Sequence, residues 1–274
     1  MNLVRNLLYI CLSMFAPFLI GANHIQILTS KPQQGSMIVG KLISGERVYF
    51  DKRELVLNDK KLFVFGVGRE APEEISLTII ANNQQVNIPI KIKQRQWKIE
   101  RVDGLPPAKV NPKSAETIQR IRQEAGLVRQ ARSQMSRLEL FDDAFILPAK
   151  GRISGYYGSQ RVLNGEPKRP HYGLDIANKT GTPVLAALGG KITLVHHDMF
   201  YSGGTLIIDH GYGISSTYIH LNSIDVQEGD IVKQGQQVGT IGATGRATGP
   251  HLDWRVNWFD TRLDPQLLIN ELNN

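Results

Sequence analysis

Short segments in which apolar and polar residues alternate recur along most of this chain, and this two-residue period constrains its fold more than any other feature. Successive side chains of a strand point to opposite faces, so such segments form strands that bury one face. In the N-terminal third we expect strands at residues 37–43, 46–51, 61–67, 75–81, 85–93 and 96–102. Turn-forming pairs such as Asn82-Asn83 separate them. The pattern predicts a mainly β chain whose first domain, residues 23–102, is a small Ig-like β-sandwich that serves as a spacer or docking module.

The residues that follow this domain predict a linker and a helix. Residues 103–113 contain three prolines, which is typical of a stiff linker. Ser114 then offers an N-terminal cap, and Ile118, Ile121 and Val128 recur with helical spacing. We therefore expect a linker and helix within residues 103–140, with the polar face of the helix in solvent. A helix that lies on a membrane surface is the alternative.

The first residues have the layout of a secretory signal peptide. Arg5 supplies the positive charge, residues 7–20 carry no charge, and the small residues Gly21 and Ala22 follow. We expect a signal peptide over residues 1–22 and an exported protein in the periplasm or cell envelope, without a transmembrane segment after cleavage. An uncleaved anchor is the alternative, although the apolar run is short for a span of about 20 residues. Because Cys11 is the single cysteine, the mature chain would use neither disulfides nor thiol chemistry.

The net charge of +7 narrows the choice of partners. A basic protein can bind nucleic acid, but an exported chain rarely meets it. Anionic cell-wall polymers or phospholipid headgroups are the expected partners, and a solvated basic surface without a specific partner is the alternative.

Chemistry-bearing residues are concentrated in the C-terminal half, which holds six of the seven histidines. His171 and Asp175 are four residues apart, so on a strand they share one face. His251 and Asp253 share a face for the same reason, and His220 ends another strand-like segment. Spacing alone is a weak signal, because a surface histidine near a turn aspartate gives the same pattern.

The order of the motifs is more specific than any one of them. An HxxxD motif at residue 171 is followed by YxHL at 218, GDxVxxGQ at 229 and GPHL at 249. This series resembles the LytM/lysostaphin family of peptidoglycan zinc metalloendopeptidases over about residues 147–268. The resemblance implies a domain over residues 141–274 in which loops on an antiparallel β-sheet form a cleft. It also implies cleavage of peptide cross-links of peptidoglycan during cell-wall remodelling, with one divalent metal ion, expected to be zinc.

The resemblance also implies residue roles. His171 and Asp175 correspond to the first two metal ligands, and His220 and His251 to the catalytic pair that manages protons and stabilises the transition state, with their division of labour left open. Asp253 stands where the family has a histidine ligand. A carboxylate can bind zinc, so we expect Asp253 as the third ligand, with an added negative charge that dampens the acidity of bound water and softens the preference for zinc. The alternative is that Asp253 orients a nearby histidine.

Two further expectations concern substrate and regulation. We expect Arg161, Arg169 and Tyr218 to contact substrate, although residues 158–170 could be a plain basic loop, or could cover the cleft. His196, His197 and His210 match no motif and are expected at the surface or in turns.

The rival function is a catalytically weak or inactive binding module that regulates a cell-wall amidase. Because four of the five site positions match the family, we favour an enzyme. Such a module would have a cell-wall enzyme as its partner in addition to peptidoglycan. A protease for proteins outside the wall is a weaker alternative.

Overall fold

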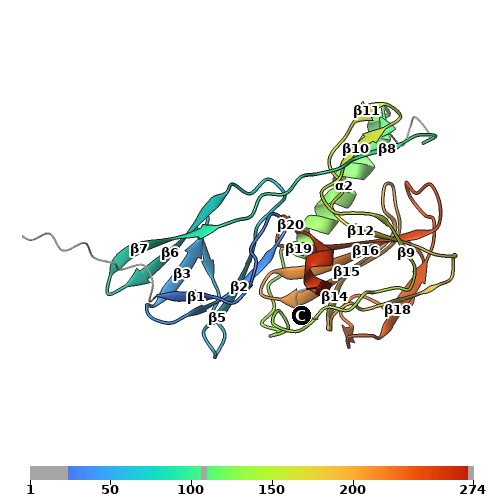
Figure 1. Cartoon of the computed structure of the whole chain (residues 1–274). Helices are drawn as coiled ribbons and strands as arrows, with labels where there is room; N and C mark the ends of the chain where they lie inside the picture. The colour runs from blue at the N-terminus through green and yellow to red at the C-terminus, as the bar shows by residue number, and fades with distance from the viewer. Residues whose placement is uncertain (1–23, 106–109, 271–274) are drawn as a thin grey trace, which may run out of the picture.

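The computed structural model describes residues 24–105 and 110–270, which form two β-rich parts joined by a connecting segment and a helix (Figure 1). The expected signal peptide, with Arg5, Cys11 and the cleavage site after Ala22, lies outside the described residues. Among the described residues, no helix has both the length and the apolar character that a membrane span requires.

The N-terminal part contains two antiparallel sheets, as its alternating segments predict. A three-stranded sheet has the order β1-β2-β5 and a four-stranded sheet the order β4-β3-β6-β7. The strands are β1 (Ile25–Ile27), β2 (Met37–Leu42), β3 (Arg47–Phe50), β4 (Arg53–Leu55), β5 (Leu62–Gly66), β6 (Glu74–Ala81) and β7 (Gln84–Lys91). Ile75, Leu77 and Ile79 alternate inward along β6 and are buried. Asn82 and Asn83 both have positive φ, which is the two-residue hairpin turn that their sequence predicts. The Ig-like character of this part stays a prediction.

The last strand expected in the first domain pairs elsewhere. β8 (Ile99–Val102) lies parallel to β10 (Gln160–Leu163), which pairs in turn with β11 (Glu166–Pro167). The side chain of Ile99 is 64% exposed, so this strand has no fully apolar face to add to a sandwich. The connecting segment, of which β8 is part, therefore lies beside residues 158–170 of the C-terminal part.

Helix α2 (Ala115–Arg132) begins where the sequence predicts, because the Ser114 side chain accepts a hydrogen bond from the Thr117 N–H. The expectation that its polar face is solvated is wrong for two residues. Glu124 and Arg132 are buried, since α2 packs on β14 and β15, where Ala131 joins a small apolar cluster. The Glu124 carboxylate accepts hydrogen bonds from the Phe200 N–H and from Arg120.

The C-terminal part is built on a ten-stranded sheet whose main path runs β17-β14-β15-β16-β19-β12-β9, with every pairing antiparallel. Its elements are β9 (Arg152–Gly155), β12 (Leu174–Ala177), β13 (Pro183–Leu185), β14 (Gly190–Met199), β15 (Gly203–Gly211), β16 (Ile214–Ile224), β17 (Ile231–Val232), β18 (Gln237–Ile241), β19 (His251–Trp258), β20 (Thr261–Leu263) and helix α3 (Pro265–Asn270). Leu252 and Trp254 of β19 are fully buried on the core side, so the opposite face of this strand carries His251 and Asp253.

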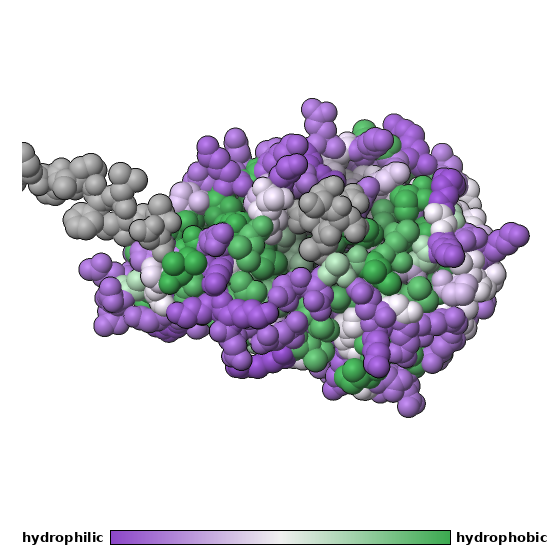
Figure 2. Space-filling view, turned by 60° about the horizontal axis from the view of Figure 1, so that its bottom comes forward, coloured by the Kyte–Doolittle hydropathy of each residue, from purple (hydrophilic) through white to green (hydrophobic). Residues whose placement is uncertain are grey.

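One face of the molecule is shown in Figure 2, where hydrophobic residues gather in separate areas over both parts of the chain, with hydrophilic side chains between them. In the N-terminal part, the side chains of Leu28 and Ile43 are 45% and 50% exposed. The docking role expected for this part stays a prediction.

His210 corrects a sequence expectation, because it lies in the core and not at the surface. Its ring is fully buried, with Nδ1 2.7 Å from the Gly189 carbonyl oxygen and Nε2 2.7 Å from Ser216 Oγ. Burial lowers the pKa of His210 to about 4. The ring is therefore neutral at neutral pH and serves packing.

This burial predicts acid lability. The unfolded chain takes up a proton on His210 near its ordinary pKa of about 6.5, whereas the folded chain does so only near pH 4. Stability should therefore fall as the pH drops through this window, by up to about 3 kcal/mol from this group. We expect urea unfolding measured from pH 7.5 to pH 4.5 to show a shallower pH dependence in His210→Gln than in the wild type. An equal dependence in both would contradict this assignment.

Candidate metal centre and cleft

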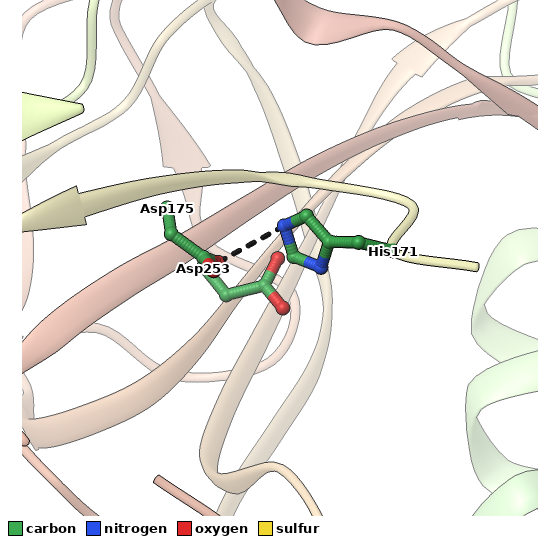
Figure 3. Close-up of side chains that lie close together, drawn as sticks. All are labelled: His171, Asp175 and Asp253. Atoms are coloured by element: carbon green, nitrogen blue, oxygen red, sulfur yellow. Dashed lines mark ion pairs between the residues drawn. The ribbon is translucent and has the colours of Figure 1, made fainter. Parts of the chain in front are cut away.

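Three buried side chains of metal-ligand type meet on the face of the C-terminal sheet that lies opposite Leu252 and Trp254. The ligand atoms of His171, Asp175 and Asp253 all lie within 4.8 Å of one another (Figure 3). Strand register produces this meeting, because Asp175 in β12 lies directly opposite Asp253 in β19. His171 precedes β12, and its backbone N–H donates to the Ser159 carbonyl oxygen at 2.8 Å. The structure thus brings together the three residues that the sequence proposes as ligands.

The donor atoms of this cluster suit a metal ion. His171 Nε2 and Asp175 Oδ1 form an ion pair at 3.1 Å, but both atoms are buried without a well-aligned hydrogen bond among the described residues. Buried polar groups that lack good hydrogen bonds are costly, by up to about 1–3 kcal/mol each. Imidazole nitrogen and carboxylate oxygen are ligands that zinc accepts. The residues present therefore fit a divalent ion, whose identity stays a prediction.

Two glycines leave the space that the carboxylates occupy. A Cβ atom on Gly173 would lie 2.0 Å from Asp253 Oδ1, and one on Gly155 would lie 2.3 Å from Asp175 Oδ2. No real side chain tolerates such contacts, so both positions require glycine for this arrangement. The sequence indicates this role for Gly173, which stands between His171 and Asp175.

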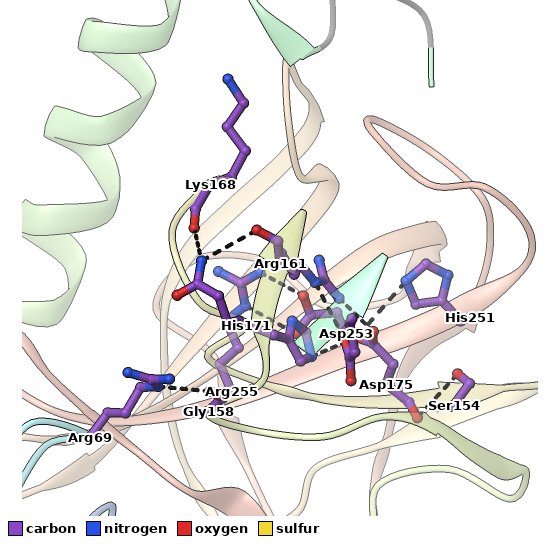
Figure 4. Close-up of polar contacts among 12 residues, drawn as sticks. Arg69, Ser154, Gly158, Arg161, Lys168, His171, Asp175, His251, Asp253 and Arg255 are labelled. Carbon is purple, nitrogen blue, oxygen red and sulfur yellow. Dashed lines mark hydrogen bonds and ion pairs between the residues drawn. The ribbon is translucent and has the colours of Figure 1, made fainter. Parts of the chain in front are cut away.

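Two arginines pair with the carboxylates of the centre (Figure 4). Arg255 donates from Nε to Asp253 Oδ1 at 2.9 Å and from Nη2 to Asp253 Oδ2 at 2.5 Å. Arg161 donates from Nη2 to Asp175 Oδ2 at 2.8 Å. Burial raises the pKa of Asp253, but Arg255, together with the smaller effects of His171 and His220, more than offsets this and holds that pKa well below its usual range. Both carboxylates are therefore ionised.

Arg255 changes the charge balance that we expect from the sequence. An aspartate in place of a histidine adds a negative charge, but the guanidinium of Arg255 offsets it. Each carboxylate oxygen carries two lone pairs, so pairing with Arg255 leaves Asp253 able to bind a metal ion. Sequence reasoning missed Arg255, although its place two residues after Asp253 puts both on one strand face.

The two histidines expected to be catalytic lie beside this cluster. The ring centroids of His220 and His251 are 4.8 Å apart, and His251 Nε2 is 4.0 Å from Asp175 Oδ1. Their Nδ1 atoms lie 2.8 Å from the carbonyl oxygens of Thr244 and Gly249, respectively. A carbonyl only accepts, so both Nδ1 atoms carry the hydrogen and both Nε2 atoms stay available.

The backbone and the surroundings of His220 are unusual. Its φ of +65° is sparsely populated by residues other than glycine, and such strain persists where the surrounding structure enforces it. Burial lowers the pKa of His220 to about 4, against the opposing effect of Asp253. The ring is therefore neutral and able to accept a proton at neutral pH.

A cleft of about 340 Å³ lies beside these residues. Asp175, His220 and His251 line it, together with Arg161. Val102 and its neighbours in the connecting segment contribute to the lining as well. The segment that joins the two parts of the chain is thus one wall of the cleft.

The other two residues expected to contact substrate lie elsewhere. Tyr218 is fully buried and its hydroxyl accepts a hydrogen bond from the Ala187 N–H at 2.8 Å, so a direct contact with substrate is wrong for this residue. The alternation along β16 explains this, since Tyr218 faces the core side, away from its neighbours Thr217 and Ile219. Arg169 lines a separate cavity on the side of helix α2.

Comparisons with known proteins show similarity to peptidases, chiefly in the C-terminal part. Residues 169–265 match peptidase family M23. The peptidoglycan DD-endopeptidase ShyB of Vibrio cholerae is 42% identical over 87 residues, which are 32% of this chain and 20% of ShyB. The DD-carboxypeptidase/endopeptidase Mpg of Neisseria meningitidis serogroup B is 41% identical over 108 residues, or 39% of this chain and 25% of Mpg. The matches thus span about a fifth to a quarter of these relatives.

A solved structure described as a peptidase M23 from Pseudomonas aeruginosa is similar over most of the chain. It aligns with a TM-score of 0.70 and 28% sequence identity, covering 89% of this chain and 97% of that one. The similarity therefore extends beyond the matched domain into the N-terminal part.

Proposed function

We propose that this chain, which belongs to peptidase family M23 through residues 169–265, hydrolyses peptide cross-links of peptidoglycan with the help of one divalent metal ion, expected to be zinc. The observation that carries the proposal is the meeting of three ligand-type side chains beside a cleft that Asp175, His220 and His251 line. The names of the relatives favour the D,D-cross-link as the bond cleaved.

His171, Asp175 and Asp253 would hold the ion. When bound, a divalent ion acidifies a water molecule and polarises the carbonyl of the scissile peptide bond. The Nε2 atoms of His220 and His251 then manage the protons, because both rings are fixed through Nδ1. A ring that has accepted a proton can donate it to the departing amine.

Digestion of purified peptidoglycan sacculi tests this proposal. The full chain loaded with zinc should convert cross-linked dimers into monomers, measured by chromatography of the muropeptides. A chelator should stop the reaction and added metal should restore it. If zinc- and manganese-loaded protein both leave the dimers intact, the proposed activity is wrong.

Export to the periplasm or cell envelope belongs to the same proposal, because the substrate lies there. The charge and hydropathy pattern of residues 1–22 supports it. N-terminal sequencing of protein recovered from the periplasmic fraction should find a start at Asn23. A start at Met1 in that fraction would contradict cleavage.

The pairing of both carboxylates with arginine favours a second candidate, a binding module that regulates a cell-wall amidase. Positive charge beside the ligands opposes a cation. This candidate predicts that the chain binds sacculi and stimulates an amidase without cleaving cross-links, so the digestion experiment separates the two functions.

A further inference from the structure

A second cavity, of about 400 Å³, lies between helix α2 and the C-terminal sheet. Five arginines line it, accompanied by only two carboxylates, those of Glu124 and Asp260. The arginines are Arg129, Arg132, Arg169, Arg255 and Arg262. We call this space the arginine cavity.

The floor of the arginine cavity continues from the metal centre. In the pairing of β16 with β19, Thr217 lies opposite Arg255 and Ile219 lies opposite Asp253. Thr217, Ile219 and Arg255 line the cavity, so they lie on the sheet face that carries Asp253. The hydrogen bonds from Arg255 to Asp253 join the two sites directly.

The carboxylates nearby do not balance the arginines. Glu124 is already engaged by Arg120 and by a backbone N–H, and Asp253 is engaged by Arg255. Asp260 is the lining carboxylate that raises the pKa values of Arg132 and Arg262, and it offsets only part of the lowering by burial and by the neighbouring arginines. Arg132 is 6% exposed, donates from Nη2 to Thr217 Oγ1 at 3.1 Å, and has an Nε atom without a hydrogen-bond partner among the described residues. A buried donor without a protein partner can donate a hydrogen bond to an acceptor atom of a ligand without breaking a bond within the protein.

The electrostatics agree with this geometry. Burial, and then the charges of Arg262 and Arg255, hold the pKa of Arg132 well below its usual range. Burial and Arg255 likewise lower the pKa of Arg262 to about 10, and its Nη1 atom donates to the neutral side-chain amide of Asn257 at 3.2 Å. An anion in the cavity would relieve both the desolvation and the mutual repulsion of these guanidinium groups.

We propose that the arginine cavity binds a carboxylate group of the peptide substrate, beside the bond that the metal centre would cleave. The proposal rests on the proposed function for the identity of that substrate. A guanidinium matches a carboxylate through two parallel hydrogen bonds, so a cluster of arginines selects this group over a neutral amide. The shared floor with the metal centre favours a carboxylate of the substrate over an unrelated anion.

Calorimetric titration of the full chain in chelator tests binding without turnover. The probes are the peptide N-acetyl-Lys-D-Ala-D-Ala, the same peptide with a C-terminal amide, and inorganic phosphate. We expect the free carboxylate to bind at least about tenfold more tightly than the amide, as loss of a charge-assisted hydrogen bond predicts. Arg132→Gln and Arg262→Gln should each weaken this binding about tenfold or more. Arg122→Gln on the exposed side of α2 is the matched control and should not.

Thermal unfolding distinguishes a binding role from a structural one. Because Arg132 is buried without sufficient counter-charge, Arg132→Gln should raise the melting temperature while it weakens binding of the carboxylate. A lowered melting temperature together with unchanged binding would assign Arg132 a structural role and overturn the proposal.

Equal binding of acid and amide, or binding of phosphate alone, would overturn it as well. If sacculi stay intact while carboxylate binding persists and depends on Arg132, the proposed enzymatic function fails but the anion site stands. The two proposals therefore fail separately.

Discussion

Replacement of His220 or His251 should reduce hydrolysis of peptidoglycan cross-links by about 10²–10⁴-fold, the range that general acid–base groups supply. Both rings are fixed through Nδ1 and neither belongs to the three-residue ligand cluster. Bound metal and the fold should therefore persist in the variants. His251→Ala serves at one position. At the other, His220→Asn is preferable, because asparagine tolerates the φ of +65° better than alanine does.

The measurement pairs muropeptide release with elemental analysis of the purified variants. His197→Ala is a matched control, since His197 is exposed and does not line the cleft. Its rate and metal content should equal those of the wild type. A variant of His220 or His251 that loses its metal would show that this residue is a ligand, and our division of roles would then be wrong.

The sequence predicts the strands well because they follow from local periodicity, whereas the grouping of His171, Asp175 and Asp253 is expected from the family resemblance. Residues with a two-residue spacing share a strand face wherever the strand finds its partner, so His251 and Asp253 could be placed before the sheet was known. The order of motifs in the family then points to His171 and Asp175 as partners of these residues. The register that sets Asp175 opposite Asp253 is non-local, but it agrees with that expectation.

Non-local pairing also explains what sequence reasoning missed. The parallel pairing of β8 with β10 joins residues about 60 positions apart, and no local sequence pattern indicates it. Arg132 and Glu124 look like solvated helix residues until α2 is seen to pack on the sheet. Tyr218 stands in a functional motif, yet the alternation of β16 turns its side chain into the core. In each case the tertiary partner, and not the residue type, decides the role.

The second large effect concerns the pair formed by Asp253 and Arg255. If Asp253 is the third ligand, Asp253→Asn should remove most of the bound metal, because a neutral amide is a much weaker ligand than a carboxylate. Asparagine keeps the shape and one hydrogen bond to Arg255. Alanine would instead leave Arg255 buried without its partner, which costs about 3–5 kcal/mol and confuses metal loss with unfolding. If Asp253 only orients a neighbour, the loss should be about 10–100-fold in affinity or activity.

Arg255→Gln should act in the opposite direction. The guanidinium contacts Asp253 at 2.5–2.9 Å, so its positive charge opposes a cation held by the same carboxylate. At an effective dielectric constant of about 20, removing a unit charge close to a divalent ion is worth several kcal/mol. We expect metal affinity to rise at least about tenfold, measured by competition with a chromophoric chelator. The metal-free variant should in turn be less stable than the wild type, since Asp253 loses its partner, and metal should restore its melting temperature.

Combining Asp253→His with Arg255→Gln tests the charge balance itself. The histidine removes the negative charge of Asp253, and the glutamine removes the positive charge that offsets it, so the net charge of the centre is unchanged. If Arg255 is present to compensate Asp253, this double variant should bind metal better than Asp253→His alone, in which the arginine faces a neutral ligand. Equal metal affinity in the double variant and in Asp253→His would mean that Arg255 does not influence the ion. Its pairing with Asp253 would then serve the arginine cavity, where the same guanidinium forms part of the lining.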